Sequence, residues 1–236
     1  TTDKDNSTAP MRGIYSINAG YKVEAGCDYP FLPVGQPCPS EDLLKSSFSG
    51  FNMAMEASGA STSYTVRVEQ SEFSDNLWNI LIEEMDNVSI NRNEIEVADA
   101  GYTLTGSNTG AGIVIYASTG YIVEENTLTT NFSNPVDFGI FISNSGEDDN
   151  RVYKNSINGY EYGNLATGVN HNTGYSKGLQ FLCNNFEENG KAIYIGFTTQ
   201  NDDGIRYNQG DFVSLYYPLY ITSSAGNTFI NNTMDI

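Results

Sequence analysis

Positive charge, histidine and cysteine are all scarce in this chain. It has 11 Lys and Arg residues against 29 Asp and Glu, one His, three Cys and a formal net charge of −18. Nucleic acid and an anionic membrane surface are therefore poor partners, because both repel an acidic protein. No run of about 18 apolar residues occurs, which gives no expectation of membrane insertion. Apolar residues three and four apart do not recur along the repeat described below, which excludes a helical solenoid.

The compartment is predicted from the cysteines and the first residues. Cys27 and Cys38 bracket a Pro-rich loop, and we expect a disulfide between them in an oxidising environment. The polar segment Thr1 to Pro10 has no signal-peptide character, so we expect any export signal to be absent from this chain. Cys183 lacks a neighbouring His or cationic pair and is expected to be a buried or half-buried free thiol. The predicted localisation is secreted or cell surface.

A short apolar pattern recurs along the chain, and residues 177–197 contain one complete copy. In this copy Leu179, Phe181 and Phe186 alternate with other residues around Asn184, and a strand-like segment follows. Period-2 alternation is typical of β-strands. The marker positions that correspond to Asn184 are Ser46, Ser71, Asn93, Asn126, Asn155, Asn184, Gly210 and Asn232.

Successive markers lie between 22 (71 to 93) and 33 (93 to 126) residues apart, a spacing typical of a solenoid whose units stack on one another. We therefore predict an all-β, right-handed parallel β-helix of about eight coils. Residues 1–42 form a lead-in, a partial first coil and a loop-rich cap, and residues 43–236 form the β-helix as one structural domain. Because the chain stops soon after a marker, we expect a piece of a longer protein or an open C-terminal edge that contacts another domain or chain.

Two physical reasons favour asparagine at the marker. Asn adopts left-handed backbone angles at sharp turns better than most residues. Asn side chains in successive coils can also hydrogen-bond to one another as a ladder. The residues predicted to form this asparagine ladder are Asn93, Asn126, Asn155, Asn184 and Asn232.

On these repeats, and on the segment GLQFLCNNFEENGKAIYIG, the chain resembles the right-handed parallel β-helix superfamily. That superfamily is typified by pectin lyases and by the periplasmic copper-site maturation and carbohydrate-binding β-helix repeats. More narrowly, residues 43–236 look like β-helix regions of secreted or surface proteins of Bacteroidetes that use the type IX system. The resemblance implies the fold, whereas activities differ widely within the superfamily.

The second strand of each coil is predicted to expose an uncharged column on its outer face: Tyr15, Ala54, Leu81, Val114, Phe141, Ala166, Tyr194 and Tyr220. The inserts at residues 96–112 and 129–137 can cover this face. Otherwise the column forms a glycan platform, with Tyr15, Phe141, Tyr194 and Tyr220 as the ligand-binding residues, or a protein interface.

The first strands place Arg67, Arg151 and Arg206 in another outward column, among carboxylates that can pair with them. A polysaccharide lyase or glycoside hydrolase acting on a uronate-containing polysaccharide would use Arg151, Arg206, Asp148 and Asp149 as its catalytic residues. The hydrolase elements Gly-His-Gly and Arg-x-Lys are absent, and the single histidine, His171, is expected to be exposed and inert. Glu147, Asp148 and Asp149 are a speculative Ca²⁺ site, and no other cofactor is expected.

The favoured interpretation is a noncatalytic extracellular or cell-surface β-helix that serves as a rigid stalk, an adhesin or a glycan-binding surface. Its expected partner is a polysaccharide or a cell-surface protein. The alternative is the lyase or hydrolase.

Overall fold

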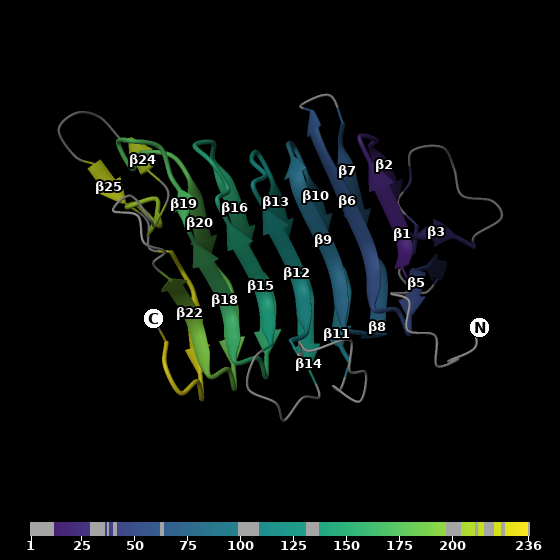
Figure 1. Cartoon of the computed structure of the whole chain (residues 1–236). Helices are drawn as coiled ribbons and strands as arrows, with labels where there is room; N and C mark the ends of the chain where they lie inside the picture. Colours follow the sequence, from purple (N-terminus) through teal and green to yellow (C-terminus); the bar gives the residue numbers. More distant parts are fainter. Residues whose placement is uncertain are drawn as a thin grey trace.

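Parallel strands stacked along one axis make up most of the part of the chain that the structure describes. The computed structural model describes residues 12–28, 36, 38–39, 42–61, 64–98, 109–130, 137–196, 204–210, 212–214, 220–222 and 225–235. Three parallel sheets run the length of the stack, with β1 at one end and β22 at the other (Figure 1). The architecture is a right-handed parallel β-helix, which confirms the predicted fold. Among the described residues, no helix is long and apolar enough to cross a bilayer.

Each coil contributes one strand to each sheet, except that the coil that contains β22 and β26 has no strand in sheet 2. Sheet 1 contains, in order, β1 (Arg12–Ile17), β6 (Met53–Ser61), β9 (Trp78–Met85), β12 (Ala111–Tyr116), β15 (Phe138–Ser143), β18 (Tyr162–Thr167) and β22 (Lys191–Gly196). Sheet 2 contains β2 (Tyr21–Val23), β7 (Val66–Glu69), β10 (Ser89–Asn91), β13 (Ile122–Glu124), β16 (Asn150–Tyr153) and β20 (Leu179–Leu182). Sheet 3 contains β5 (Ser46–Ser49), β8 (Ser71–Asn76), β11 (Glu94–Val97), β14 (Thr127–Thr130), β17 (Ser156–Asn158), β21 (Asn185–Glu187) and β26 (Thr228–Ile230).

Three pairs of short strands lie outside these sheets. Strand β19 (Val169–Asn170) pairs in parallel with β23 (Gly204–Ile205). Strand β24 (Phe212–Ser214) pairs antiparallel with β25 (Tyr220–Thr222), and β3 (Gly26–Cys27) pairs antiparallel with β4 (Leu43–Leu44). A disulfide joins Cys27 to Cys38 beside β3.

The interior is built from apolar columns, as the alternation in the sequence requires. One column of sheet 2 consists of Val68, Ile90, Val123, Val152 and Phe181. One column of sheet 3 consists of Phe48, Phe73, Ile95, Leu128, Ile157, Phe186 and Phe229. Rings at its two ends stack, Phe48 on Phe73 at 5.0 Å and Phe186 on Phe229 at 5.6 Å between centroids. Burial of these columns is the main stabilising contribution, because no single coil encloses its own apolar face.

Asparagine side chains form a buried ladder between sheets 2 and 3. The Asn93 amide donates to Asn126 at 2.9 Å, Asn126 to Asn155 at 2.9 Å, and Asn155 to Asn184 at 3.0 Å. Each of these amides also donates to a backbone carbonyl, such as that of Ile90 for Asn126. The ladder therefore satisfies both the side chains and the backbone at the turn.

The left-handed backbone angle falls one residue before the ladder, at Arg92, Glu125, Lys154 and Cys183, with φ between 54° and 55°. Hydrogen bonding in the ladder, and not turn geometry, therefore explains the choice of asparagine. Because Cys183 occupies this turn position, its thiol is exposed, and the expectation of a buried or half-buried thiol was wrong.

The last two predicted repeats are out of register. The ladder continues from Asn184 to Asn227 at 3.2 Å, whereas Asn232 pairs with Asn189 at 3.1 Å in a second, short ladder. Gly210 belongs to neither ladder, because β23 pairs with β19 outside the three large sheets. The predicted positions of Gly210 and Asn232 were therefore wrong. The fixed apolar-Asn-apolar pattern also fits the segment five residues further along, which concealed the shift.

Candidate functional site

The outer face of sheet 1 carries two columns of side chains that alternate with the buried columns. The column that includes Tyr15 continues through Glu56, Leu81, Val114, Phe141, Leu165 and Tyr194. The other starts at Arg12 and continues through Met53, Trp78, Ala111, Phe138, Tyr162 and Lys191. Both columns point away from the core, but four of their members are themselves buried: Glu56, Ala111, Val114 and Leu165.

Two positions of the predicted outer column were wrong. On β6, Glu56 is the register partner of both Tyr15 and Leu81, so Glu56 and not Ala54 belongs to the column that contains Tyr15. The apolar residues Met53 and Met55 both suit an inner position, so the sequence left this register undetermined. Leu165 replaces Ala166, because the inner position on β18 holds the polar residue Asn164.

The expectation that this column carries no charge was also wrong. Glu56 is an acidic member of the column and forms an ion pair with Arg12, with 3.0 Å between Oε2 of Glu56 and Nε of Arg12. The guanidinium of Arg12 also lies 4.5 Å from the centroid of the Tyr15 ring. The N-terminal part of the column is therefore an ion pair beside one exposed ring.

Aromatic rings gather on the three strands at the other end of sheet 1. Phe138 lies 5.4 Å from Phe141 and 5.5 Å from Tyr162, and Tyr162 lies 5.5 Å from Tyr194, measured between ring centroids. Tyr194 is 40% exposed, and the other three rings are half-buried. We call these four residues the aromatic row. Only Phe141 and Tyr194 were predicted, and Phe138 and Tyr162 belong to the second column.

A lysine lies over two rings of the aromatic row. The Lys191 ammonium is 4.2 Å from the Tyr162 centroid and 5.2 Å from the Tyr194 centroid. It donates to the Tyr162 hydroxyl at 3.1 Å and pairs with Glu161 at 3.3 Å. The hydrogen bond to Tyr162 is the main cause that raises the pKa of Lys191. The row thus combines ring faces with a hydroxyl, an ammonium and a carboxylate.

Other predicted ligand contacts lie away from the row. Tyr15 is 50% exposed on the same column but at the opposite end of the sheet. The side chain of Tyr220 is outside the part of the chain that the structure describes. The same holds for residues 99–108 and 131–136, which form most of the inserts expected to cover this face.

The basic residues do not share a single column. Lys22, Arg67 and Arg151 lie in one outward column of sheet 2, with Ser89 and Ile122 between the two arginines. Arg206 instead follows β23 and pairs with Asp149 at 3.1 Å. The prediction that Arg206 continues the column was wrong, because the strand that precedes it has left sheet 2.

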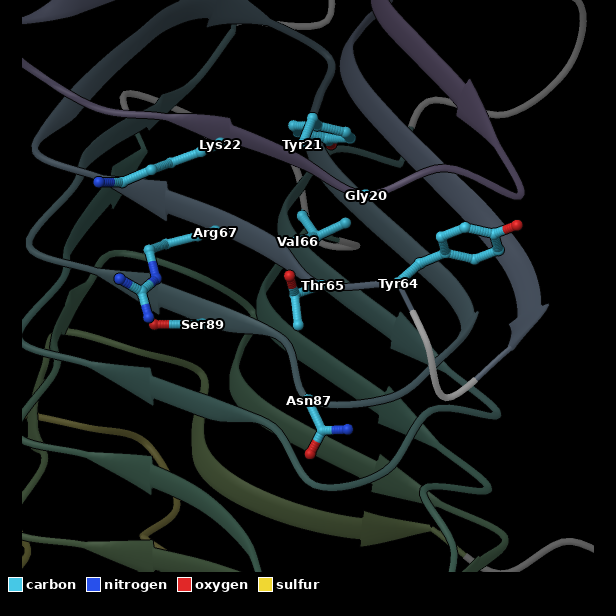
Figure 2. Close-up of a pocket in the computed structure, with 9 residues that line it drawn as sticks. All are labelled: Gly20, Tyr21, Lys22, Tyr64, Thr65, Val66, Arg67, Asn87 and Ser89. Atoms are coloured by element: carbon cyan, nitrogen blue, oxygen red, sulfur yellow. The ribbon is translucent and has the colours of Figure 1, made fainter.

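A cavity of about 440 Å³ opens at the start of this basic column. Its lining residues are Gly20, Tyr21, Lys22, Tyr64, Thr65, Val66, Arg67, Asn87 and Ser89 (Figure 2). Four of these residues come from the turns that lead into β2, β7 and β10, and the other five are at the starts of these strands. Apolar periodicity does not identify such a combination. We call this cavity the Arg67 pocket.

The acidic loop predicted as a catalytic or Ca²⁺ site is largely solvent-facing. Glu147, Asp148 and Asp149 are exposed, and Asp148 contacts the Thr119 hydroxyl at 3.4 Å. Among the described residues, no group of three or more His, Cys, Asp or Glu side chains is arranged to hold a metal ion. The Ca²⁺ site at this loop therefore has no support from the geometry.

His171 is buried, contrary to expectation. It is 3% exposed, and its ring stacks on Tyr175 at 3.6 Å between centroids. Its Nδ1 lies 2.7 Å from the carbonyl oxygen of Asn172. The loop from Asn172 to Lys177 folds back on the Asn172 side chain and holds Tyr175 against the imidazole, which covers it.

The comparison with protein families matches residues 45–181 to the family described as periplasmic copper-binding protein (NosD). This span is more than half of the 236 residues. The chain belongs to the NosD family. No curated protein and no solved structure matches it. Membership agrees with the parallel β-helix and with the expected localisation outside the cytoplasm.

The copper binding in the NosD description can be compared with the ligands that this chain offers. Copper prefers His, Cys and Met ligands. In the described part of the chain, Met55 and Met85 are wholly buried in the core, His171 is stacked against Tyr175, and Cys183 is exposed on a turn. Met53 is half-buried on β6 at the other end of the stack from the exposed Met234, which bridges to β22. These residues do not fit a copper ion, because within the described ranges they do not assemble a copper site.

Proposed function

We propose that this NosD-family β-helix is a noncatalytic glycan-binding protein of the cell exterior that binds a polysaccharide along the aromatic row. The observation that carries the proposal is the continuity of the row. Four rings on β15, β18 and β22 follow one another at 5.4 to 5.5 Å, on the outer face of a rigid sheet.

The chemistry of the row suits a sugar chain. Aromatic rings combine a large apolar contact area with a polar group in the case of Tyr, so they contact the C–H face of a pyranose and its hydroxyls together. Lys191 and Glu161 sit beside the rings, where they can exchange hydrogen bonds with sugar hydroxyls. The sheet holds the rings in place before binding, which reduces the entropy lost on association.

The alternative of a lyase or hydrolase lacks a comparable arrangement. Arg206 and Asp149 pair with each other, so neither is available as an unpaired cation or base in this geometry. Arg151 is exposed on sheet 2, in the same column as Arg67. A lyase needs a base and a cation that converge on one uronate, and these residues do not supply that pair.

Native affinity electrophoresis in gels that contain neutral or acidic polysaccharides tests the proposal. We expect at least one polysaccharide to retard the wild-type chain. Tyr194→Ala and Phe141→Ala should each lower the affinity, measured from the retardation, about tenfold. We take the magnitude from the stacking of nucleic-acid bases on aromatic side chains, which contributes about 1–3 kcal/mol per ring.

Tyr15→Ala is the matched control, because Tyr15 is also an exposed ring of the same column, 50% against 40% for Tyr194, and lies outside the row. If it weakens binding as much as Tyr194→Ala, the row is not the site. Release of reducing ends or of unsaturated products from any retarding polysaccharide would show that the protein is an enzyme.

A further inference from the structure

The Arg67 pocket is a polar cavity that the proposed function leaves unused. It opens on sheet 2, not on the face that carries the aromatic row, and its volume of about 440 Å³ lies within the range of ligand sites. Among the described residues, no carboxylate lines it, although the chain has 29 acidic residues. The two charged side chains that line the pocket, Lys22 and Arg67, are both cations.

Two cations lie side by side at this pocket. Lys22 on β2 and Arg67 on β7 are direct register partners, and their side chains extend in the same direction along the strands (Figure 2). Like charges in such positions repel each other and destabilise a sheet. Lys22 pairs with Glu24, and Arg67 lies 3.6 Å from Glu69. The Lys22–Glu24 pair is exposed, and the Arg67–Glu69 contact joins an exposed arginine to a half-buried carboxylate. Pairs in which at least one partner is exposed contribute little to stability.

The guanidinium of Arg67 has unused hydrogen-bonding capacity. Its contact to Glu69 runs from Nε and, at 3.6 Å, is too long for a hydrogen bond. Its terminal nitrogens make no hydrogen bond within the described part of the chain. A guanidinium presents paired N–H donors in a planar fork that matches a carboxylate. Arg67 is therefore prepared to bind a carboxylate through two parallel hydrogen bonds.

The rest of the pocket offers polar groups and the rings of two tyrosines, Tyr21 and Tyr64. Ser89 and Asn87 lie below Arg67, and Tyr64 lies at the far side of the pocket from the two cations (Figure 2). A hydroxyl, an amide and a ring face are the groups that contact the hydroxyls and the apolar face of a sugar. A ligand that fills this pocket needs a negative charge at one end and a hydroxylated ring at the other.

We propose that the Arg67 pocket binds a carboxylate-bearing sugar, a uronate unit of an acidic saccharide, with the carboxylate on Arg67 and Lys22 and the sugar ring toward Tyr64. This assignment does not rest on the aromatic row, since the two sites use different sheets and different residues.

Isothermal titration of the full chain with oligogalacturonate, and with the same oligomer as its methyl ester, tests the assignment. The ester keeps the sugar ring and removes the charge, so it should bind about tenfold to a hundredfold more weakly, as expected for loss of a charge-assisted hydrogen bond. Arg67→Gln should weaken binding of the acid by a similar factor. Arg67→Lys keeps the charge without the fork and should give an intermediate affinity.

Arg151→Gln is the matched control, because Arg151 is an exposed arginine of the same column that does not line the pocket. Its affinity for the acid should equal that of the wild-type chain, and circular dichroism should show all variants folded. Equal binding of acid and ester, or an equal loss in Arg67→Gln and Arg151→Gln, would overturn the proposal. Citrate should compete poorly with the oligomer at constant ionic strength. If citrate binds as tightly as the oligomer, the pocket is a general anion site and the proposal is overturned. Tyr194→Ala should leave the affinity for the acid unchanged, because the row is on another sheet, and a loss in Tyr194→Ala with none in Arg67→Gln would overturn the proposal.

Discussion

The inner and outer faces of sheet 1 use the same strands under opposite constraints. The inner column through Ile80, Ile113 and Ile140 is fully enclosed, and each coil repeats nearly the same side chain. The outer column one residue later changes from an ion pair at Glu56 to a ring at Tyr194. Packing density fixes the inner face, because a cavity or an extra methylene group is costly there. The outer face has no such constraint, so differences between its ends reflect what contacts the surface.

The largest expected effect is on the inner side of the stack. Phe186→Ala removes a wholly buried ring that stacks on Phe229, and it should lower the free energy of unfolding by about 3–5 kcal/mol. Urea denaturation followed by circular dichroism measures the change. The half-buried ring Phe141 on the outer face provides the control, and Phe141→Ala should cost much less. Equal costs would mean that the two faces are not differently constrained.

The asparagine ladder should give the next largest effect. Asn126→Ala removes the hydrogen bonds to Asn155 and to the carbonyl of Ile90, and it leaves buried groups of the adjacent coils unsatisfied. The expected loss is about 2–3 kcal/mol. The control is Asn158→Ala, at a half-buried position of sheet 3 outside the ladder, which should change the stability by less than about 0.5 kcal/mol. A ladder variant as stable as this control would show that the hydrogen bonds of the ladder contribute little to stability.

Asn164 is a polar residue on the otherwise apolar inner face, and its replacement should raise the free energy of unfolding. Asn164 is wholly buried in the column between Ile140 and Ile193, and neither polar atom of its side chain has a hydrogen-bond partner in the described residues. Asn164→Leu should stabilise the protein by about 1–2 kcal/mol, because an unsatisfied buried amide costs about that much. Thermal unfolding measures the shift. The reverse change one coil earlier, Ile140→Asn, should be strongly destabilising. A destabilised Asn164→Leu would contradict the assignment.

The sequence predicted the parts of the fold where only one type of residue fits. The columns through Val123, Phe181 and Leu128 were predictable because an enclosed position must be apolar. The prediction failed where apolar residues fit two registers, as at Met53 and Met55, and where the inner residue is polar, as at Asn164. It failed again after Asn184, because the apolar-Asn-apolar pattern recurs five residues further along.

The candidate sites were less predictable than the fold. Alternation found Phe141 and Tyr194 but missed Phe138, Tyr162 and Lys191. These three directly precede Gly139, Gly163 and Ala192, in the small-residue position where the next coil approaches closely. An added Cβ at Gly139, for example, would lie 2.6 Å from the carbonyl oxygen of Gly163. A large residue followed by a small one is therefore a sequence signal for this outer column. The Arg67 pocket has no such signal, because turn residues and the starts of three strands build it together.

The smallest expected effect on stability is on the outer face, at Lys191. Its pKa is raised in the folded chain, mainly by the hydrogen bond to the Tyr162 hydroxyl, so protonation and folding favour each other. This contribution is fully present below the pKa of about 10.4 that Lys has in an unfolded chain, and it disappears as the pH rises through the higher folded value. Wild type should therefore exceed Lys191→Met in stability by well under 1 kcal/mol at pH 8, and the difference should shrink above pH 10. Urea denaturation of wild type and Lys191→Met at pH 8 and at a pH above 10 measures this difference. The two chains contain the same tyrosines, so the titration of the tyrosines outside this contact cancels in the comparison. A difference that grows with pH would mean that Lys191 is not stabilised in its charged form, and the row would then lack the ammonium that the proposed sugar contact uses.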